Sequence, residues 1–371
     1  MIIRIEDIKD LCSKILSAVD SSEVSQLTET LQLKTDGTVL HLSVTNREYF
    51  ADVKFDMKEE IEFNATVNAM LFLKLISQTT SETVELNVND TALVVRGNGL
   101  YKLPLIYDGN KLLELPPIDI NNVTNEFDIK GDVLNSILLY NTKELTRGMA
   151  VRPAQKMYYV DEKGAITFTS GACVNNFTLP QNVKLLLTPK LVKLFKLFKG
   201  GDVHFRLGYD AISDDIIQTK VSFEDDSVSI TTILSCDDTL LNSVPVSAIR
   251  GRAMNTYPHS VTLNKDAVLQ TINRLLLFHT DKVSKPFSTV EFSKEYLTLY
   301  GEGKGNKEEI FYTGTSNIEN VYSAVLDMND LKSVLETCDE QYITVSFGDS
   351  QAFVISRGNV YNVIPEVKQV S

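Results

Sequence analysis

A repeat of about 120 to 140 residues limits most strongly what this chain can fold into. Amphipathic helices are predicted to begin near residues 66, 188 and 327, and each is followed by a helix-breaking turn and alternating strands. A second set of helices is predicted to begin near residues 6, 131 and 265, with a similar spacing. Because two independent markers share one period, the sequence predicts three copies of one domain, which we place at residues 1–122, 123–250 and 251–371.

The hydrophobic spacing defines the fold class of the repeated unit. Ile8, Leu11 and Ile15 fall on one helical face, and Asn264 is a predicted N-cap for a helix near 265–278. Alternating runs at 31–34 and 38–42 are joined by Asp36-Gly37, a hairpin signal, and similar hairpins are predicted at 158–168 and 220–233. The sequence therefore predicts an α+β fold in which each domain carries two helices on antiparallel sheets.

Composition and charge narrow the class of protein. The chain of 371 residues carries a formal net charge of −13, which argues against a tight, groove-reading DNA binder. We find no signal peptide and no apolar run of the ~20 residues that a membrane span needs. The four cysteines lie far apart and form no C-x-x-C pair, as expected for reduced core thiols. These features predict a soluble cytoplasmic protein.

The helix near residues 190–199 runs against the overall negative charge. Its apolar residues fall on one stripe, whereas Lys190, Lys193 and Lys196 fall on the opposite face. One interpretation is a solvated surface that keeps the protein soluble. The other is a surface that faces phosphate.

The helix near residues 265–278 carries an apolar pair on its polar side. Leu277 falls opposite the stripe of Val268, Ile272 and Leu275, and Phe278 follows it. An isolated exposed leucine is common, but beside a phenylalanine it can mark a subunit contact.

No catalytic or metal-binding constellation is recognised. The glycine-rich segment 301–305 lacks the spacing of a phosphate loop and lies between two strand-like runs. The four histidines show no metal-ligand spacing, so neither a metal nor a cofactor is expected. One alternative stays open at this stage, namely a repeat-domain enzyme or ligand-binding protein. Its carboxylate site would lie near Asp225, Asp226, Asp237 and Asp238.

The order of several segments resembles the β sliding clamp of bacterial DNA polymerase III. Residues 127–139, Arg147 to Arg152, the strand 166–171, and the helix that begins at Thr188-Pro189-Lys190 and ends at Gly200-Gly201-Asp202 follow the order of the family's middle domain. Ser243-Val244-Pro245 and residues 266–274 resemble the passage into its third domain, and Tyr361 to Pro365 resembles its tyrosine–aliphatic–proline ending.

The resemblance implies a ring of two head-to-tail protomers that encircles duplex DNA without sequence specificity. It implies a processivity factor with no catalytic site of its own, which an ATP-dependent loader places on DNA and which tethers a DNA polymerase and other replication and repair proteins. Such a ring needs only a hole that does not repel DNA, so an acidic outer wall is compatible with the function. The DNA-facing residues implied are Lys74, Arg147, Arg152, Lys190, Lys193 and Lys196.

The resemblance also implies two protein contacts. Tyr101 and Leu103 of the first domain would face Leu277 and Phe278 of the third domain in the dimer interface. A groove for short linear motifs of partner proteins would be lined by Ala154, Thr169, Gly171, Val174, Val244, Ile364 and Pro365.

The groove segment departs from the family pattern at two places. Ala172 and Cys173 replace the usual His-Arg pair, and the chain continues past Pro365 with a longer, more polar ending. Asp20-Ser21-Ser22-Glu23 stands where the first domain of the family carries basic groups. These departures suggest a divergent clamp with its own partner set, as a phage- or plasmid-encoded clamp in a bacterial cytoplasm would have.

Overall fold

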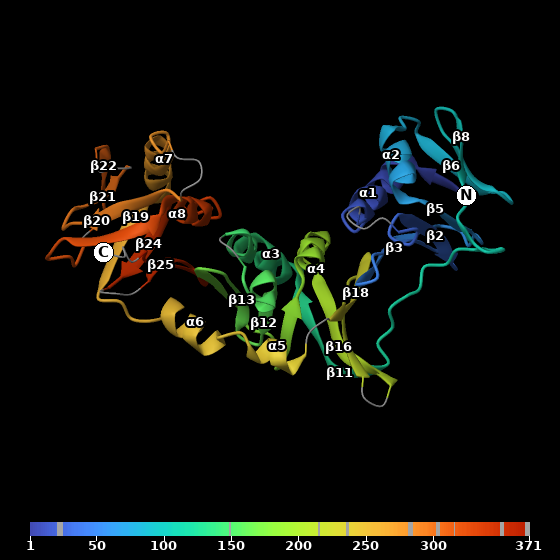
Figure 1. The fold of residues 1–371 in the computed structure, drawn as a ribbon. Coiled ribbons are helices and arrows are strands. Elements are labelled where there is room, and N and C mark those ends of the chain that lie inside the picture. Colours follow the sequence, from blue (N-terminus) through green and yellow to red (C-terminus); the bar gives the residue numbers. More distant parts are fainter. Residues whose placement is uncertain are drawn as a thin grey trace. The chain divides into compact units, whose positions relative to one another are not determined.

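The computed structural model describes residues 1–20, 25–147, 150–213, 216–234, 237–280, 285–301, 305–314, 316–348 and 352–367. Residues 21–23 of the acidic first-domain segment and 302–304 of the glycine-rich segment lie outside the described residues. The chain divides into two compact units, and Figure 1 labels helices and strands of both. Unit 1 contains Met1–Asn135 and Lys190–Ser235, and unit 2 contains Ser136–Pro189 and Cys236–Ser371. The three-domain division at residues 122 and 250 stays a prediction from the repeat.

Unit 1 carries its helices on antiparallel sheets. Its helices are α1 (Ile5–Leu16), α2 (Ala69–Gln78) and α4 (Pro189–Leu194), the last continued by the 3-10 turn η2 (Phe195–Leu197). Its strands are β1 (Ile2–Arg4), β2 (Thr30–Asp36), β3 (Val39–Thr45), β4 (Tyr49–Asp56), β5 (Asn64–Asn68), β6 (Thr83–Val88), β7 (Ala92–Arg96), β8 (Leu100–Pro104), β9 (Tyr107–Asp108), β10 (Lys111–Leu112), β11 (Asn122–Lys130), β16 (Asp202–Ser213), β17 (Ile216–Glu224) and β18 (Val228–Leu234).

The strands of unit 1 form a long sheet and a shorter one. The long sheet has the order β11-β16-β17-β18-β4-β3-β2-β5, and the shorter one has the order β1-β6-β7-β8, so β8 is an edge strand. Helices α1 and α2 pack against each other, and α1 also packs on β3 and β4. The stripe predicted on the first helix is buried, including Ile8, Leu11 and Ile15. The hairpins predicted at 31–42 and 220–233 are present as β2–β3 and β17–β18.

Unit 2 contains most of α3 (Gly131–Thr146) and four further α-helices among its described residues. These are α5 (Asp238–Asn242), α6 (Val246–Ala253), α7 (Lys265–Leu276) and α8 (Met328–Leu335), together with the 3-10 turn η1 (Pro153–Lys156). Its strands are β12 (Tyr158–Asp161), β13 (Gly164–Phe168), β14 (Ala172–Asn176), β15 (Lys184–Leu187), β19 (His259–Asn264), β20 (Phe287–Phe292), β21 (Tyr296–Tyr300), β22 (Lys307–Phe311), β23 (Tyr322–Asp327), β24 (Tyr342–Phe347), β25 (Phe353–Arg357) and β26 (Val360–Ile364).

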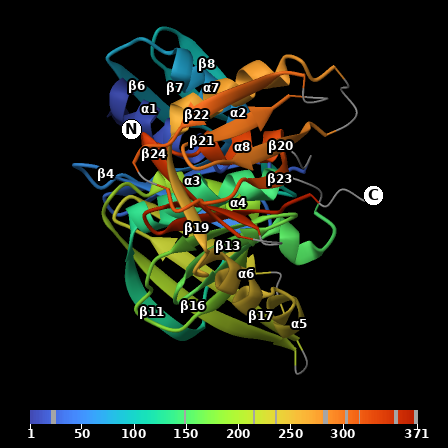
Figure 2. The ribbon, with the colours of Figure 1, turned by 90° about the vertical axis from the view of Figure 1, so that its left-hand side faces the viewer.

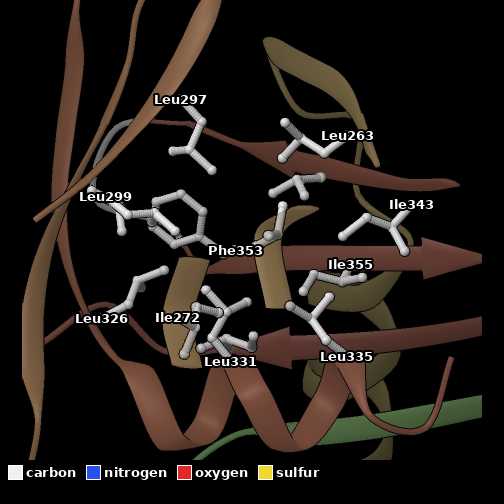
Figure 3. Close-up of a cluster of buried hydrophobic side chains, with 14 of the residues drawn as sticks. Leu263, Ile272, Leu297, Leu299, Leu326, Leu331, Leu335, Ile343, Phe353 and Ile355 are labelled. Atoms are coloured by element: carbon white, nitrogen blue, oxygen red, sulfur yellow. The ribbon is translucent and has the colours of Figure 1, made fainter. Parts of the chain in front are cut away.

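One sheet of unit 2 joins segments that are distant in sequence. Its order is β15-β12-β13-β14-β26-β25-β24-β19, so β14 near residue 174 pairs with β26 near residue 361. The second sheet has the order β22-β21-β20-β23, with β22 at an edge, and Figure 2 shows these strands as neighbouring orange ribbons. Helices α7 and α8 pack against each other beside these sheets. An apolar core lies between them, in which Leu331 and Leu335 of α8 face Phe353 and Ile355 of β25 (Figure 3).

Some predicted element boundaries are confirmed, but residues 66–68 belong to strand β5, so α2 begins at Ala69 rather than near residue 66. Asn264 accepts a hydrogen bond from the backbone of Ala267 and so caps α7, as predicted. Gly164 in the β12–β13 turn has φ +132°, and a Cβ there would lie 2.1 Å from the carbonyl oxygen of Asn175. Only glycine fits this position. Helices α5 and α6 were not predicted, because prolines at 245 and 258 read as breaks between domains.

Within the part of the chain that the structure describes, no helix is long and apolar enough to cross a membrane.

Candidate functional site

The lysine-bearing helix α4 has the two faces that its sequence predicts. Leu191, Leu194, Phe195 and Phe198 are buried. The Phe195 ring meets Phe223 of β17 edge-on at 4.9 Å between ring centroids, which anchors the helix on the long sheet of unit 1. Because the apolar stripe fixes the rotation of the helix, the opposite face is turned to solvent.

The three lysines of that face differ in their surroundings. Lys193 and Lys196 are exposed, and neither pairs with an acidic side chain among the described residues. Lys190 is half-buried, and its Nζ lies 2.7 Å from Oδ2 of Asp20. No sequence pattern signals this ion pair, because 170 residues separate the partners. Lys193 of α4 and Lys196 of η2 are therefore the lysines of this face whose charge is open to an anion.

The other predicted DNA-facing residues are divided between surface and interior. Lys74 on α2 and Arg152 before η1 are exposed. Arg147 is buried, and its guanidinium lies 2.5 Å from Glu144 and 3.7 Å from Asp330. A side chain held in this way does not reach DNA, so we leave Arg147 out of the DNA-facing set.

Each unit has an exposed apolar patch beside an edge strand. In unit 2, Leu277 is 79% exposed, Phe278 is 53% exposed, and Phe311 of the edge strand β22 is also exposed. In unit 1, Leu100 and Tyr101 of the edge strand β8 are exposed. Leu103 of the same strand is buried, so only its backbone is available to a partner chain. Exposed apolar side chains along a sheet edge are the features of a surface that pairs with another chain.

Three of the seven residues predicted to line a partner groove, Ala154, Val174 and Val244, belong to one apolar cluster in unit 2. We call this set the β14–β26 cluster, and it contains the buried Ala154, Val174, Val244 and Val363 together with Tyr159, Ile166, Phe168, Ala172, Leu186, Ile249, Ala253 and Val354. Partly exposed apolar side chains cover it, namely Met157, Leu240, Leu241, Val246, Tyr257, Ala352 and Tyr361. Sequence reasoning missed these covering residues.

Ile364, which was predicted to line the groove, lies outside the β14–β26 cluster because side chains alternate along β26. Val363 belongs to the β14–β26 cluster, whereas Ile364 is fully buried in the core between α7, α8 and the second sheet of unit 2. Successive side chains of a strand point to opposite faces, so the two residues cannot share one pocket. Pro365 is half-buried, and two residues later the backbone N–H of Val367 donates to the carbonyl of Val325 at 2.9 Å.

The same alternation places the two β14 residues that depart from the family pattern, Ala172 and Cys173, on opposite faces of the sheet. Ala172 lies in the β14–β26 cluster, so this position adds apolar surface where the family pattern has a polar side chain. Cys173 points to the other face, where it is fully buried and its Sγ donates to the carbonyl of Tyr140 at 3.5 Å. Burial raises the pKa of this thiol to about 12, so it is an inert core residue.

Two of the four carboxylates of the alternative site are used in local structure. Asp225 accepts backbone hydrogen bonds from Ser227 and Val228 in the β17–β18 turn, and Asp237 caps α5 through the N–H of Leu240. Among the described residues no group of three or more His, Cys, Asp or Glu side chains is arranged to hold a metal.

A Ser–His–Asp grouping occurs in a cleft of about 570 Å³ in unit 1, but its connectivity is not that of a nucleophilic triad. Ser43 donates to Oδ1 of Asp52 at 2.7 Å, and Nδ1 of His41 lies 2.6 Å from Oδ2 of the same carboxylate. This hydrogen bond with Asp52 raises the pKa of His41. Since the hydroxyl donates to the carboxylate and not to the imidazole, His41 does not activate Ser43 as a base.

Comparison with solved structures gives full-length matches. The β subunit of DNA polymerase III from Borrelia burgdorferi is 15% identical with a TM-score of 0.78, covering 99% of this chain and 98% of that chain. The Bacillus subtilis sliding clamp is 14% identical with a TM-score of 0.79, covering 99% and 98%. The Helicobacter pylori β clamp bound to a DNA ligase peptide is 14% identical with a TM-score of 0.74, covering 99% of each chain.

No protein-family model and no curated protein matches the sequence. The chain nonetheless has the α+β DNA-clamp fold of bacterial DNA polymerase III β subunits along its full length, at low sequence identity.

Proposed function

We propose that this protein is a DNA sliding clamp, a non-catalytic processivity factor that encircles duplex DNA. The observation that carries the proposal is the full-length match in fold to the β subunits of DNA polymerase III, with 98% or more of each of the compared chains covered. Structures with this fold are described as clamps or polymerase III β subunits from several bacteria.

The exposed lysines supply the DNA-facing charge in this proposal. Lys193, Lys196, Lys74 and Arg152 are solvent-exposed, whereas Lys190 is paired with Asp20. Contacts of lysine with phosphate are independent of sequence and are weakened by salt. A few such contacts keep a ring on the duplex axis without fixing it at one position, which suits sliding.

Ring closure would join the two exposed patches head to tail. Strand β8 and Tyr101 of one protomer would meet β22, Leu277, Phe278 and Phe311 of the other. The contact is heterologous, and two copies of it close a ring when the two protomers are related by a half turn. Exposure of the Leu277 side chain to water is unfavourable in a monomer, and this contact would bury it.

The β14–β26 cluster would receive short segments of a DNA polymerase, a clamp loader and other replication or repair proteins. The Helicobacter pylori clamp is described as binding a DNA ligase peptide, which is the kind of partner that we propose here. The covering residues Met157, Leu240 and Tyr257 give this chain an apolar surface for an aliphatic or aromatic anchor.

Light scattering over a concentration series tests ring formation. We expect a mass of about twice the 41.5 kDa of the chain, and a mass near 41.5 kDa for the variant with Leu277→Asp and Phe278→Asp. A control variant with Ile217→Asp, which alters another exposed apolar residue, should keep the mass of the wild type. A wild-type mass near 41.5 kDa throughout the series would contradict a stable two-protomer ring.

A further inference from the structure

Three ionisable side chains form a buried group beside the β14–β26 cluster. Glu144 of α3, Arg147 and Asp330 of α8 have side chains that are 1%, 3% and 8% exposed. We call them the buried ion group. Glu144 and Asp330 both approach the guanidinium, at 2.5 and 3.7 Å. Buried charges are costly unless they are paired, and removing one partner leaves an uncompensated charge.

Arg147 extends from this group to the strand that the cluster shares. Its Nη2 donates to the carbonyl oxygen of Val363 at 3.2 Å, and the Val363 side chain belongs to the β14–β26 cluster. The opposite neighbour of the guanidinium is Gly171, where a Cβ would lie 2.0 Å from Nη2 and 2.3 Å from the same carbonyl. The guanidinium therefore lies between the β13–β14 turn and β26.

The turn is also held from its other side. The Thr169 hydroxyl lies 2.5 Å from the carbonyl oxygen of Arg147 and 2.6 Å from Oε1 of Glu144. The backbone N–H of Thr169 donates to the same carboxylate at 3.2 Å, and Gln155 donates to the carbonyl of Thr169 at 3.3 Å. Arg147 and Glu144 thus fix both the start of β14 and its neighbour β26, and these strands carry Ala172, Val174 and Val363 into the cluster.

We propose that Arg147 is a positioning residue for the partner site. It touches no partner, but it holds β14 and β26 in the arrangement that a partner segment recognises. The inference rests on the proposed function of the β14–β26 cluster. A preformed site binds more tightly because the ordering cost is met before the partner arrives.

Two substitutions separate positioning from stability. Arg147→Lys keeps a buried positive charge beside Glu144 but lacks the planar fork that reaches Val363. The triple variant Glu144→Gln, Arg147→Met and Asp330→Asn removes all three charges together, so it leaves no charge of the buried ion group without its partner. Arg357→Met is the matched control. Arg357 is an equally buried arginine of unit 2, but it donates to Thr337 and stacks on Tyr140 rather than touching the turn.

The first measurement is amide hydrogen exchange, which needs no partner. Arg147→Lys should speed exchange at residues 169–174 and 361–364 by about tenfold, with no change in strands β20 and β21, whereas Arg357→Met should leave the first two segments unchanged. Equal exchange in wild type and Arg147→Lys at both segments would overturn the proposal, whatever the function of the protein.

The second measurement is the affinity for the DNA ligase peptide of the Helicobacter pylori complex, at a temperature where every variant is fully folded. If wild type binds, Arg147→Lys should bind about tenfold more weakly and Arg357→Met should bind as wild type does. Equal affinity of Arg147→Lys and wild type would overturn positioning. Absence of binding by wild type would count against the proposed partner site, and the exchange result would then decide the role of Arg147 alone.

Discussion

Gly171 and Arg147 share one small space in unit 2. A methyl group on Gly171 would lie 2.0 Å from Nη2 of Arg147, far inside van der Waals contact. At this point the guanidinium donates a hydrogen bond to the carbonyl of Val363. Val363 belongs to β26, which pairs with β14, the strand that begins directly after Gly171. The absence of a side chain at residue 171 is therefore what allows a buried arginine to join two strands separated by almost 200 residues of sequence.

Gly171→Ala should destabilise unit 2 by about 1–3 kcal/mol, because the new methyl group meets both Arg147 and a backbone carbonyl that cannot move freely. Gly251→Ala in α6 is the control, since a Cβ there meets nothing within 4 Å. That variant should be neutral or more stable by about 0.5–1 kcal/mol, because alanine favours helix. Urea denaturation measures both changes, and an equal effect of the two substitutions would contradict the contact.

The buried ion group should make stability depend on pH. Burial raises the pKa of Glu144 to about 7 from its ordinary value of 4.5. Between these values the folded protein holds a proton that the unfolded chain has lost, so the free energy of unfolding falls as pH rises through this window. Burial also raises the pKa of Asp330, which acts in the same direction.

Thermal denaturation between about pH 5 and 8 checks this prediction. Glu144→Gln resembles the protonated side chain, so its melting temperature should fall less with rising pH than that of the wild type. The remaining carboxyl groups are common to both proteins, and their contributions cancel in the comparison. Parallel profiles for the two proteins would show that Glu144 titrates as it does in the unfolded chain.

Local elements of this fold are predictable from the sequence, whereas its long-range contacts are not. The stripe on α4 and the cap at Asn264 depend on residues three or four apart, and both were predicted correctly. The ion pair of Lys190 with Asp20 and the burial of Arg147 depend on tertiary contacts over 170 and more than 180 residues. No local pattern distinguishes a lysine that pairs in this way from one that stays open to solvent.

In the candidate partner site, the sequence also fails to predict which of two neighbouring residues faces the cluster. The resemblance to the clamp family pointed to Ile364, but the strand alternation gives that position to the core and presents Val363 to the β14–β26 cluster. A shift of one residue reverses which face a strand side chain occupies. The pairing of β14 with β26, which the sequence does not reveal, settles the choice.

Charge reversal on α4 and η2 should weaken DNA binding. In the variant with Lys193→Glu and Lys196→Glu, binding to linear duplex DNA at low salt should fall, and the slope of log affinity against log salt should shrink by about 0.9 for each lost phosphate contact. Lys58→Glu with Lys111→Glu is the control, because these exposed lysines lie off the helix and change the net charge equally. Both variants should fold normally. If both lose DNA binding equally, the loss comes from the change in net charge, and Lys193 and Lys196 have no special role in DNA binding.

Asp20→Asn should strengthen DNA binding. The substituted amide keeps the volume of the side chain and removes one negative charge, that of the native carboxylate, which lies 2.7 Å from the Nζ of Lys190. The control is Asp226→Asn in the exposed β17–β18 turn. It also removes one negative charge, but it leaves the ion pair of Lys190 with Asp20 in place. Fluorescence anisotropy with a duplex measures both, and a gain no larger than that of the control would show that Lys190 does not face DNA.

Topology tests the clamp proposal most directly. The protein is incubated with a linear duplex whose ends are open, the ends are then blocked with a bulky protein, and the salt concentration is raised to remove ordinary electrostatic binding. A closed ring threads over the open ends, so it should stay on the blocked DNA at high salt, leave when a restriction enzyme cuts the DNA, and fail to load on a covalently closed circle. Equal retention on the linear and circular DNA, or loss from the blocked DNA at high salt, would contradict a ring that encircles the duplex.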